Sequence, residues 1–206
     1  DDTICTADLT DDEILEGLNL LLIGDSIAVD VTDDFYEMFP NSVSDTKIGR
    51  ITSLGKQVLD SYIDEKKWEG EGVIFASLSN SPINGELEDI REKIGKDMPL
   101  FLTTVRIPHD TFEEESNSKI KKFVEENDHT YLIDWYAASE GHDEYFDADD
   151  THLLSAGAKA YAKCIKEAVL DAYKKENIEI PKSRLVSSTD TSTDSSNDSS
   201  TDTSTE

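Results

Sequence analysis

The sequence predicts an α/β fold: a three-layer sandwich in which helices cover both faces of a central parallel sheet. Short apolar runs alternate with helical patterns through the middle of the chain, which is typical of parallel strands joined by right-handed helical crossovers. In addition, polar residues capable of chemistry follow the ends of these runs, where sites form in parallel sheets. The 206 residues are enough for one domain with appendages.

Four largely apolar runs have the length of buried strands, and a fifth segment, which is more polar, is a further candidate. The strands are expected at Leu20–Ile23, Val73–Ala76, Leu100–Val105 and Thr130–Ile133, with the additional candidate at Val43–Thr46. Apolar residues that recur every three or four positions predict helices. The helices are expected at Asp11–Leu15, Ser26–Met38, Glu86–Ile94, Glu113–Glu125 and Leu153–Tyr173. Thr10 is suited to begin the first of these helices, and Gly95 ends the third.

The chain divides into three parts by composition. Residues 1–17 form an acidic N-terminal extension, residues 18–178 form the globular domain, and residues 179–206 form a tail. From about residue 187 onward the tail is almost entirely Ser, Thr, Asp and Asn, which offer nothing to bury, so we expect a disordered flexible linker. The start at Asp1 is what an excised or mature segment would show.

The chain is strongly acidic, with 46 acidic and 19 basic residues and a formal net charge of −27. Such a surface repels phosphate backbones and anionic headgroups, so we expect no nucleic acid and no membrane-surface partner. We interpret the acidic surface as a solvated one rather than as a guide for a cationic substrate. No run approaches the roughly 18 apolar residues that a membrane-spanning helix needs.

The two cysteines, Cys5 and Cys164, are too few and too far apart for a metal site or a redox motif. They are either unrelated thiols or one disulfide that ties the N-terminal segment to the last helix. We favour the disulfide, which in an exported protein would stabilise the fold by a few kcal/mol.

Ser26 lies where the first predicted strand turns into a helix, in Gly24-Asp25-Ser26. Gly24 permits a sharp turn, and a serine in the first helical turn has the backbone N–H groups and the positive helix end that stabilise an oxyanion. Alternatively, Asp25 or Ser26 does no more than cap the helix. The tripeptide alone does not decide between these interpretations.

His152 favours the catalytic interpretation, because it follows an aspartate by three residues and immediately precedes a long helical pattern. Asp149 can hold the imidazole Nδ1 so that Nε2 accepts the proton of the serine. Asp147 and Asp150 are competing orienters, and a plain loop at the start of a helix is the structural alternative. The remaining histidines lie in polar loops: His129, expected to be solvated, and His109 and His142, either of which could line a cleft.

These residues occur in the order of the four sequence blocks of the SGNH (GDSL-like) hydrolases, and the chain resembles that family from about Leu18 to Leu170. The blocks fall on Gly24-Asp25-Ser26, Gly49, Asn80 and Asp149-x-x-His152. Further motifs resemble the extracellular C-terminal domain of peptidoglycan O-acetyltransferases. They are Ile23–Ile27, Lys47–Arg50, Val105–Pro108, Ile133–Tyr136 and Gly141–Phe146. Their joint occurrence in one order makes the resemblance specific.

The resemblance implies a catalytic domain of the SGNH-hydrolase (flavodoxin-like) type that works through a serine acyl-enzyme. Ser26 would be the nucleophile, His152 the general base and then acid, and Asp149 its orienter. The oxyanion hole would use the backbone N–H groups of Ser26 and Gly49 and the side chain of Asn80.

The resemblance further implies that the reaction transfers an acetyl group to a hydroxyl of muramic acid in peptidoglycan, with no cofactor and no metal. The chain would be a monomeric domain on the extracellular face of a Gram-positive cell membrane. An upstream membrane acyltransferase domain would deliver the acetyl donor. The alternatives are a carbohydrate O-acetyl esterase, with water as the acceptor, and a cell-wall binding domain with weakened catalysis.

Three residues depart from the usual pattern of the family and motivate the binding-domain alternative. Leu78 and Ser81 flank Asn80 where relatives commonly carry glycines, and we expect them to narrow the cleft or shift the asparagine. Asp150 stands where relatives usually have glycine, and its charge is expected to raise the pKa values of the loop carboxylates.

Arg106, Trp135 and Tyr136 are candidates for substrate contact. Arg106 could bind a carboxylate or a sugar hydroxyl, although an ion pair with one of the many acidic residues is the simpler interpretation. Trp135 and Tyr136 could stack on a sugar ring, or form core or cleft wall.

Overall fold

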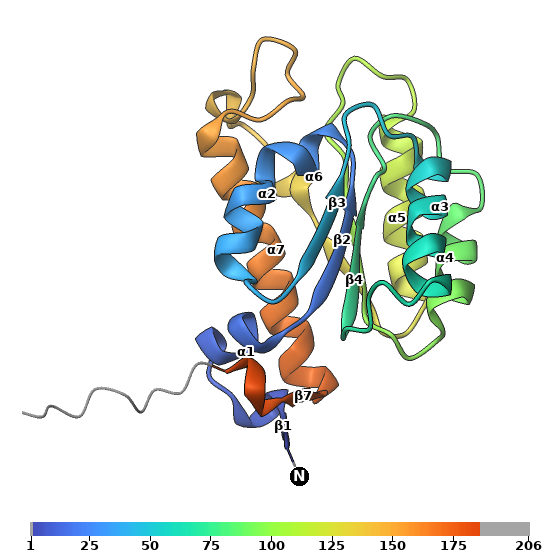
Figure 1. Ribbon diagram of the computed structural model, residues 1–206. Helices are drawn as coiled ribbons and strands as arrows, with labels where there is room; N and C mark the ends of the chain where they lie inside the picture. Colours follow the sequence, from blue (N-terminus) through green and yellow to red (C-terminus); the bar gives the residue numbers. More distant parts are fainter. Residues whose placement is uncertain (1, 186–206) are drawn as a thin grey trace, which may run out of the picture.

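Five parallel strands form the central sheet of the computed structural model, which describes residues 2–185 (Figure 1). They are β2 (Leu20–Gly24), β3 (Val43–Thr46), β4 (Gly72–Ala76), β5 (Leu100–Thr103) and β6 (Thr130–Ile133), in the spatial order β3-β2-β4-β5-β6. This is the flavodoxin-like order, in which ligands bind at the carboxyl ends of the strands, where the winding reverses between β2 and β4. The predicted parallel α/β sheet is confirmed.

Helices cover both faces of this sheet, as the prediction of three layers requires. The longer helices are α1 (Asp11–Gly17), α2 (Ser26–Met38), α3 (Thr52–Asp64), α4 (Glu86–Ile94), α5 (Glu113–Glu126) and α7 (Ser155–Glu176). The short ones are α6 (Trp135–Ala138) and the 3₁₀ turns η1 (Thr6–Asp8), η2 (Asp143–Tyr145) and η3 (Lys182–Arg184). α2 and α7 lie on one face, and α3, α4 and α5 lie on the other (Figure 1).

Alternate side chains of the strands enter two separate cores. In β2, Leu20 and Leu22 pack into the core beneath α2 and α7, whereas Leu21 and Ile23 pack into the core beneath α3, α4 and α5. All four are at most 1% exposed, and burial of each such side chain contributes roughly 1.5–3 kcal/mol. The strand that ends just before Ser26 is therefore fixed from both sides.

The predicted strands and helices are confirmed, with end shifts of no more than three residues. Thr10 caps α1 in a capping box with Glu13. Helix α3 is absent from the predictions, because its buried residues are Thr52, Gly55 and Leu59, which give little apolar periodicity.

The two ends of the described chain form a small second sheet. β1 (Thr3–Cys5) pairs antiparallel with β7 (Glu179–Pro181). The prediction of a disordered tail from residue 179 is therefore wrong for residues 179–185. A strand held by backbone pairing and one buried side chain, Ile180, leaves almost no apolar pattern in the sequence. The rest of the predicted tail, residues 186–206, lies outside the described residues.

The predicted disulfide is also wrong, because Cys5 and Cys164 are free thiols. Thr6, next to Cys5, donates its hydroxyl to the carbonyl of Tyr173 near the C-terminal end of α7 (2.8 Å). Tyr173 lies nine residues along α7 from Cys164. At a rise of 1.5 Å per residue this is about 13 Å, well beyond the ~7 Å that a disulfide allows between Cα atoms.

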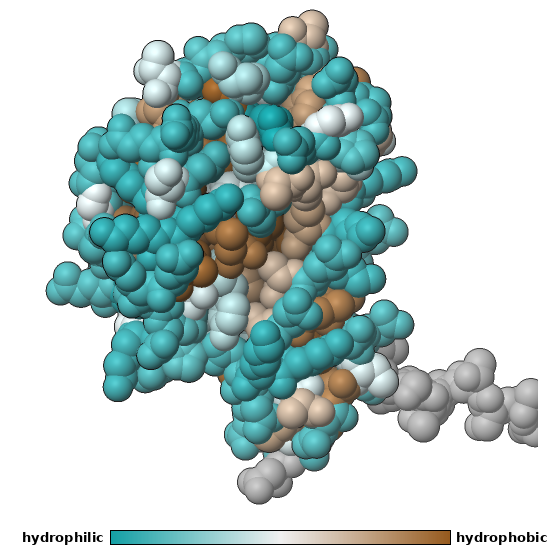
Figure 2. All heavy atoms as spheres, turned by 180° about the vertical axis from the view of Figure 1, so that it is seen from behind, coloured by the Kyte–Doolittle hydropathy of each residue, from teal (hydrophilic) through white to brown (hydrophobic). Residues whose placement is uncertain are grey.

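The surface is largely hydrophilic, as the net charge of −27 suggests. Figure 2 shows mainly hydrophilic side chains on the face turned away from the viewer of Figure 1, with a strip of apolar side chains between them. Within residues 2–185, none of the helices combines the length and apolarity needed to span a bilayer.

Candidate active site

Ser26 is the first residue of α2 and follows the carboxyl end of β2. Gly24 makes this close strand-to-helix turn possible, because a Cβ at that position would lie 2.2 Å from the Cβ of Ala28. Ser26 is only 7% exposed, so its backbone is held in a packed helical turn. The unpaired N–H groups and the positive end of the helix dipole lie at this point, which suits a developing negative charge.

Asp25 caps α2 and joins it to the loop that follows β4. Its Oδ1 accepts the N–H of Ile27 (3.1 Å), and its Oδ2 accepts the N–H of Ser79 (2.9 Å). Burial raises the pKa of Asp25, and these two hydrogen bonds oppose the shift. The capping interpretation is thus confirmed for Asp25, while the hydroxyl of Ser26 has another partner.

That partner is His152. The Nε2 of His152 lies 3.0 Å from the Oγ of Ser26, and its Nδ1 lies 2.5 Å from the Oδ2 of Asp149. When Nδ1–H donates to Asp149, Nε2 is free to accept the serine proton. The hydrogen bond with Asp149 raises the pKa of His152, and the same bond lowers the pKa of Asp149 to about 2.

Hydrogen bonds donated by backbone N–H groups hold the loop that carries His152. Asp149 Oδ1 accepts the N–H of His152 (2.9 Å), and the N–H of Asp147 donates to the carbonyl of His152 (2.8 Å). Asp30 of α2 accepts the N–H of Leu153 (3.0 Å), which ties the loop to the helix that carries Ser26. The side chains of His152 and Asp149 are 45% and 50% exposed, so these bonds rather than packing fix their positions.

The sequence patterns did not predict a role for Asp30. Asp30 lies four residues after Ser26, so both residues project from the same face of α2. This spacing is the signal that could have pointed to it.

The competing orienters face elsewhere. Asp150 Oδ2 lies 3.1 Å from Nε2 of His109, and Asp147 accepts a backbone N–H in its own turn. The expectation that Asp150 raises the pKa of its neighbours is wrong for Asp149, because the hydrogen bonds from His152 have the larger effect. Asp150 has a φ of 56°, the left-handed region that favours glycine.

Gly49 and Asn80 follow β3 and β4, the strands on either side of β2. Gly49 has a φ of +71°, and a Cβ there would meet no atom within 4 Å, so the backbone of this turn is open. Nδ2 of Asn80 donates to the carbonyl of Arg50 (3.3 Å). Both residues are exposed at the edge of the sheet where Ser26 lies, and open backbone and amide donors of this kind can stabilise an oxyanion.

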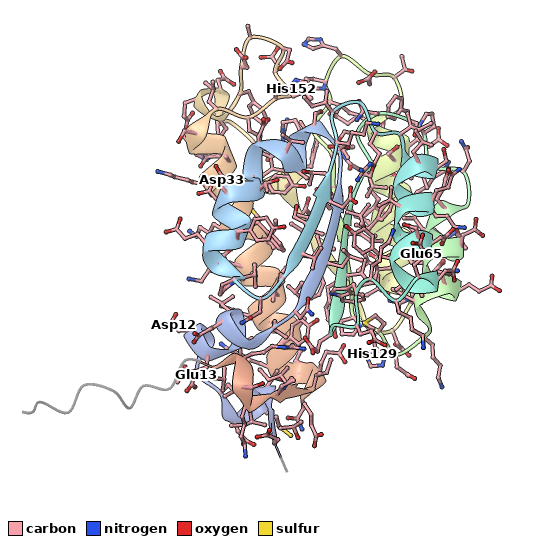
Figure 3. The ribbon with its side chains drawn as sticks, in the orientation of Figure 1. Asp12, Glu13, Asp33, Glu65, His129 and His152 are labelled. Carbon is pink, nitrogen blue, oxygen red and sulfur yellow. The ribbon has the colours of Figure 1, made fainter. Side chains whose placement is uncertain are left out.

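The histidines separate into two groups. Figure 3 shows His152 at the carboxyl end of the strands and His129 at the opposite end of the sheet. His129 is not simply solvated, since its Nδ1 lies 2.8 Å from Glu176. His142 lies 2.8 Å from Glu144 and stacks on the ring of Tyr145, in the segment before the loop that carries His152.

The residues beside Asn80 do not act as expected. Leu78 is fully buried in the core beneath α3, α4 and α5, so the expectation that it narrows the cleft is wrong. Ser81 donates its hydroxyl to Thr52 Oγ1 (3.1 Å) and accepts the N–H of Thr52 (3.0 Å). Ser81 therefore fastens the loop of Asn80 to the start of α3.

The candidates for substrate contact are mostly structural. Trp135 is 2% exposed and packs against Tyr161 and other core rings, so the prediction that it stacks on a sugar is wrong. Arg106 forms no ion pair with any residue in 2–185, contrary to the simpler interpretation. It donates to Ser139 Oγ (2.6 Å) and to the carbonyl of Tyr136 (2.5 Å). Its guanidinium lies 4.3 Å from the centre of the Tyr136 ring, and Tyr136 is 37% exposed.

Among residues 2–185, no three His, Cys, Asp or Glu side chains gather in a way that could hold a metal ion.

Comparisons with known proteins identify relatives of the chain, although no family model matches it. It is 34% identical over 146 residues to O-acetyltransferase OatA of Staphylococcus aureus (strain NCTC 8325 / PS 47), a match that covers 70% of this chain and 24% of the relative. The chain thus spans about a quarter of the length of the curated relatives it matches.

Solved structures share the fold. The C-terminal catalytic domain of peptidoglycan O-acetyltransferase A (OatA) from Streptococcus pneumoniae superposes with a TM-score of 0.69 at 21% identity, over 79% of this chain and 97% of that one. A lipase/acylhydrolase from Enterococcus faecalis superposes with a TM-score of 0.60 at 18% identity, over 75% and 96%. With its sheet order, its four blocks at one edge of that sheet and these relatives, the chain belongs to the SGNH (GDSL-like) hydrolase family, which it shares with the OatA peptidoglycan O-acetyltransferases.

Proposed function

We propose that the chain transfers an acetyl group, through an acyl-enzyme on Ser26, to a hydroxyl of muramic acid in peptidoglycan. The observation that carries the proposal is the hydrogen-bonded series from Asp149 through His152 to Ser26, with distances of 2.5 and 3.0 Å. The names of the OatA relatives, which include O-acetyltransferase and peptidoglycan, support the group transferred and the substrate class.

In the first half-reaction, Oγ of Ser26 attacks the acetyl carbonyl while Nε2 of His152 takes the serine proton. The N–H groups of Ser26 and Gly49 and the amide of Asn80 stabilise the negative oxygen of the tetrahedral intermediate. Asp149 keeps the imidazole in the required tautomer and stabilises its protonated form. The carbon–oxygen bond to the donor then breaks, and His152 protonates the leaving oxygen.

The second half-reaction reverses these roles. An acceptor hydroxyl gives its proton to Nε2 of His152 and attacks the acetyl carbonyl on Ser26. The ester bond to Ser26 breaks, and the proton returns to its Oγ. The acetyl group leaves as an ester of the acceptor, and the free enzyme is restored.

A carbohydrate O-acetyl esterase is the second candidate, because the His152 side chain is 45% exposed. Water that reaches this imidazole can replace the sugar hydroxyl in the second half-reaction. Both reactions share one acyl-enzyme, so the acceptor alone separates them.

We further propose that the domain acts as a monomer on the extracellular face of a Gram-positive membrane, without cofactor or metal. An upstream membrane domain would supply the acetyl group. The greater length of the OatA relatives leaves room for such a domain in a full-length protein.

The test is incubation with an activated acetyl ester, with and without a chitooligosaccharide or muropeptide, followed by mass spectrometry of the products. Acetylated glycan that disappears in Ser26→Ala supports the transferase, and acetate release unchanged by acceptor supports the esterase. Ser118→Ala, an exposed serine of α5, is the matched control and keeps full activity. Full activity in Ser26→Ala would refute both enzymes, and glycan binding without acylation of Ser26 would support the binding domain.

A further inference from the structure

We propose that Arg50 is the positioning residue of the oxyanion hole. This inference rests on the proposed function, because it assumes that Ser26, Gly49 and Asn80 supply the oxyanion donors. Arg50 would touch neither substrate nor reacting atoms. It would hold all three donors in one arrangement.

The side chain of Arg50 fastens the turn that carries Gly49 to the strand that carries Ser26. Its Nη1 donates to the carbonyl of Gly24 (3.1 Å), two residues before Ser26. The same Nη1 donates to the carbonyl of Asp45 (2.6 Å), and Nη2 donates to the Oδ1 of Asp45 (2.6 Å). The planar guanidinium thus spans the carboxyl ends of β2 and β3.

The backbone of Arg50 reaches the third donor. Its carbonyl oxygen accepts hydrogen bonds from Nδ2 of Asn80 (3.3 Å) and from Oγ of Ser77 (3.2 Å). Both residues lie in the segment that follows β4. Gly49 precedes Arg50 directly in the chain. Arg50 therefore forms hydrogen bonds with the segments that carry Ser26 and Asn80, and it directly follows Gly49 in the chain.

The surroundings make this arrangement rigid. Arg50 is 6% exposed, and its carboxylate partner Asp45 also accepts the hydroxyl of Tyr62 on its second oxygen (3.1 Å). A buried guanidinium with three fixed acceptors cannot be replaced by a point charge without loss of its forked geometry. Oxyanion donors act only when they lie within about 2.7–3.1 Å of the oxyanion, so a small displacement of the turn would weaken catalysis strongly.

The experiment measures kcat, KM and inhibition by an alkyl boronic acid, which forms a tetrahedral adduct on the serine. In Arg50→Lys we expect kcat to fall about 10- to 100-fold, while KM changes less than about threefold. The inhibition constant of the boronic acid should rise by about the same factor as kcat falls. Asp45→Asn, which keeps the shape of the partner but removes its charge, should show a smaller effect in the same direction. Lys47→Ala, an exposed residue of the same turn, should match the wild type in all three quantities.

Circular dichroism and the melting temperature separate positioning from loss of fold. If Arg50→Lys does not fold, Asp45→Asn decides the matter by the same two constants. Unchanged kcat, or a fall in kcat with no change in the boronate constant, would overturn the inference. Ser26→Ala keeps the two proposals apart: activity in that variant refutes the proposed function, whereas an inactive Ser26→Ala beside a fully active Arg50→Lys refutes only the role of Arg50.

Discussion

The two halves of the candidate site are built in opposite ways. Asp25 and Ser26 are at most 7% exposed and lie at the start of α2, directly after a strand that is packed between two cores. The side chains of Asp149 and His152 are 45% exposed or more and lie on a loop held by hydrogen bonds from backbone N–H groups to carboxylates. The position of the nucleophile thus depends on packing, whereas the position of the base depends on hydrogen bonds that water can compete for.

The carboxylates of the two halves show the same contrast. Burial raises the pKa of Asp25, while the hydrogen bond from the half-exposed His152 lowers the pKa of Asp149 to about 2. At neutral pH, Asp149 is therefore ionised and able to stabilise a protonated imidazole. Asp25 serves as a cap that accepts two backbone N–H groups, a role that depends on its geometry.

Among changes that test this contrast, the largest loss of activity is expected when Asp149 loses its negative charge. In Asp149→Asn, kcat should fall by about 10²- to 10⁴-fold, because the amide no longer enforces the tautomer that His152 needs. Asp147→Asn is the matched control in the same loop and should stay within about threefold of the wild type. Steady-state hydrolysis of an activated ester measures both, and an equal loss in the two variants would contradict the assignment of Asp149.

The pH dependence of kcat/KM in Asp149→Asn tests whether Asp149 raises the pKa of His152. His152 accepts a proton only when it is neutral, so activity is lost as pH falls through its pKa. Asp149 raises that pKa, and its removal should move the acid limb of kcat/KM to lower pH. Because the pair is half exposed, high salt should move the wild-type limb in the same direction. An acid limb that stays in place in Asp149→Asn would show that Asp149 does not control His152.

Asp30 joins the two halves and is expected to have an intermediate effect. In Asp30→Ala the N–H of Leu153 loses its carboxylate acceptor, and loosening of the catalytic loop should lower kcat by about tenfold. Asp33→Ala, an exposed carboxylate on the same helix (Figure 3), is the control and should have wild-type kcat. Equal activity of the two variants would mean that the loop keeps its position without α2.

The same contrast explains what the sequence could predict. Buried strands such as Leu20–Gly24 show continuous apolar runs, and the serine and histidine stand beside recognisable strand and helix ends. Helix α3 and strand β7 bury few or small side chains and leave no such pattern. The contact between Asp150 and His109 depends on the rotamers of two exposed side chains, which residue spacing does not determine.

The contact of Trp135 shows a further limit of residue patterns. An aromatic residue after a strand can face either the cleft or the core, and only the packing of Tyr145, Phe146 and Tyr161 around its ring places it in the core. These three rings come from η2, the segment just after it, and α7. Their approach to Trp135 is a product of the tertiary fold, which no local spacing encodes.

The smallest effect is expected at Asp150, where the backbone and the side chain make opposing demands. Its φ of 56° favours glycine, whereas its carboxylate lies 3.1 Å from His109 in an exposed pair worth at most about 1 kcal/mol. Asp150→Gly should therefore change the free energy of unfolding by less than about 1 kcal/mol and kcat by less than about threefold. Asp150→Ala loses the pair and keeps the backbone strain, so it should be less stable than Asp150→Gly by about 1 kcal/mol in urea unfolding. Equal stability of these two variants would mean that the loop adopts the left-handed conformation without strain. Aspartate at position 150 would then not lower the free energy of unfolding relative to glycine.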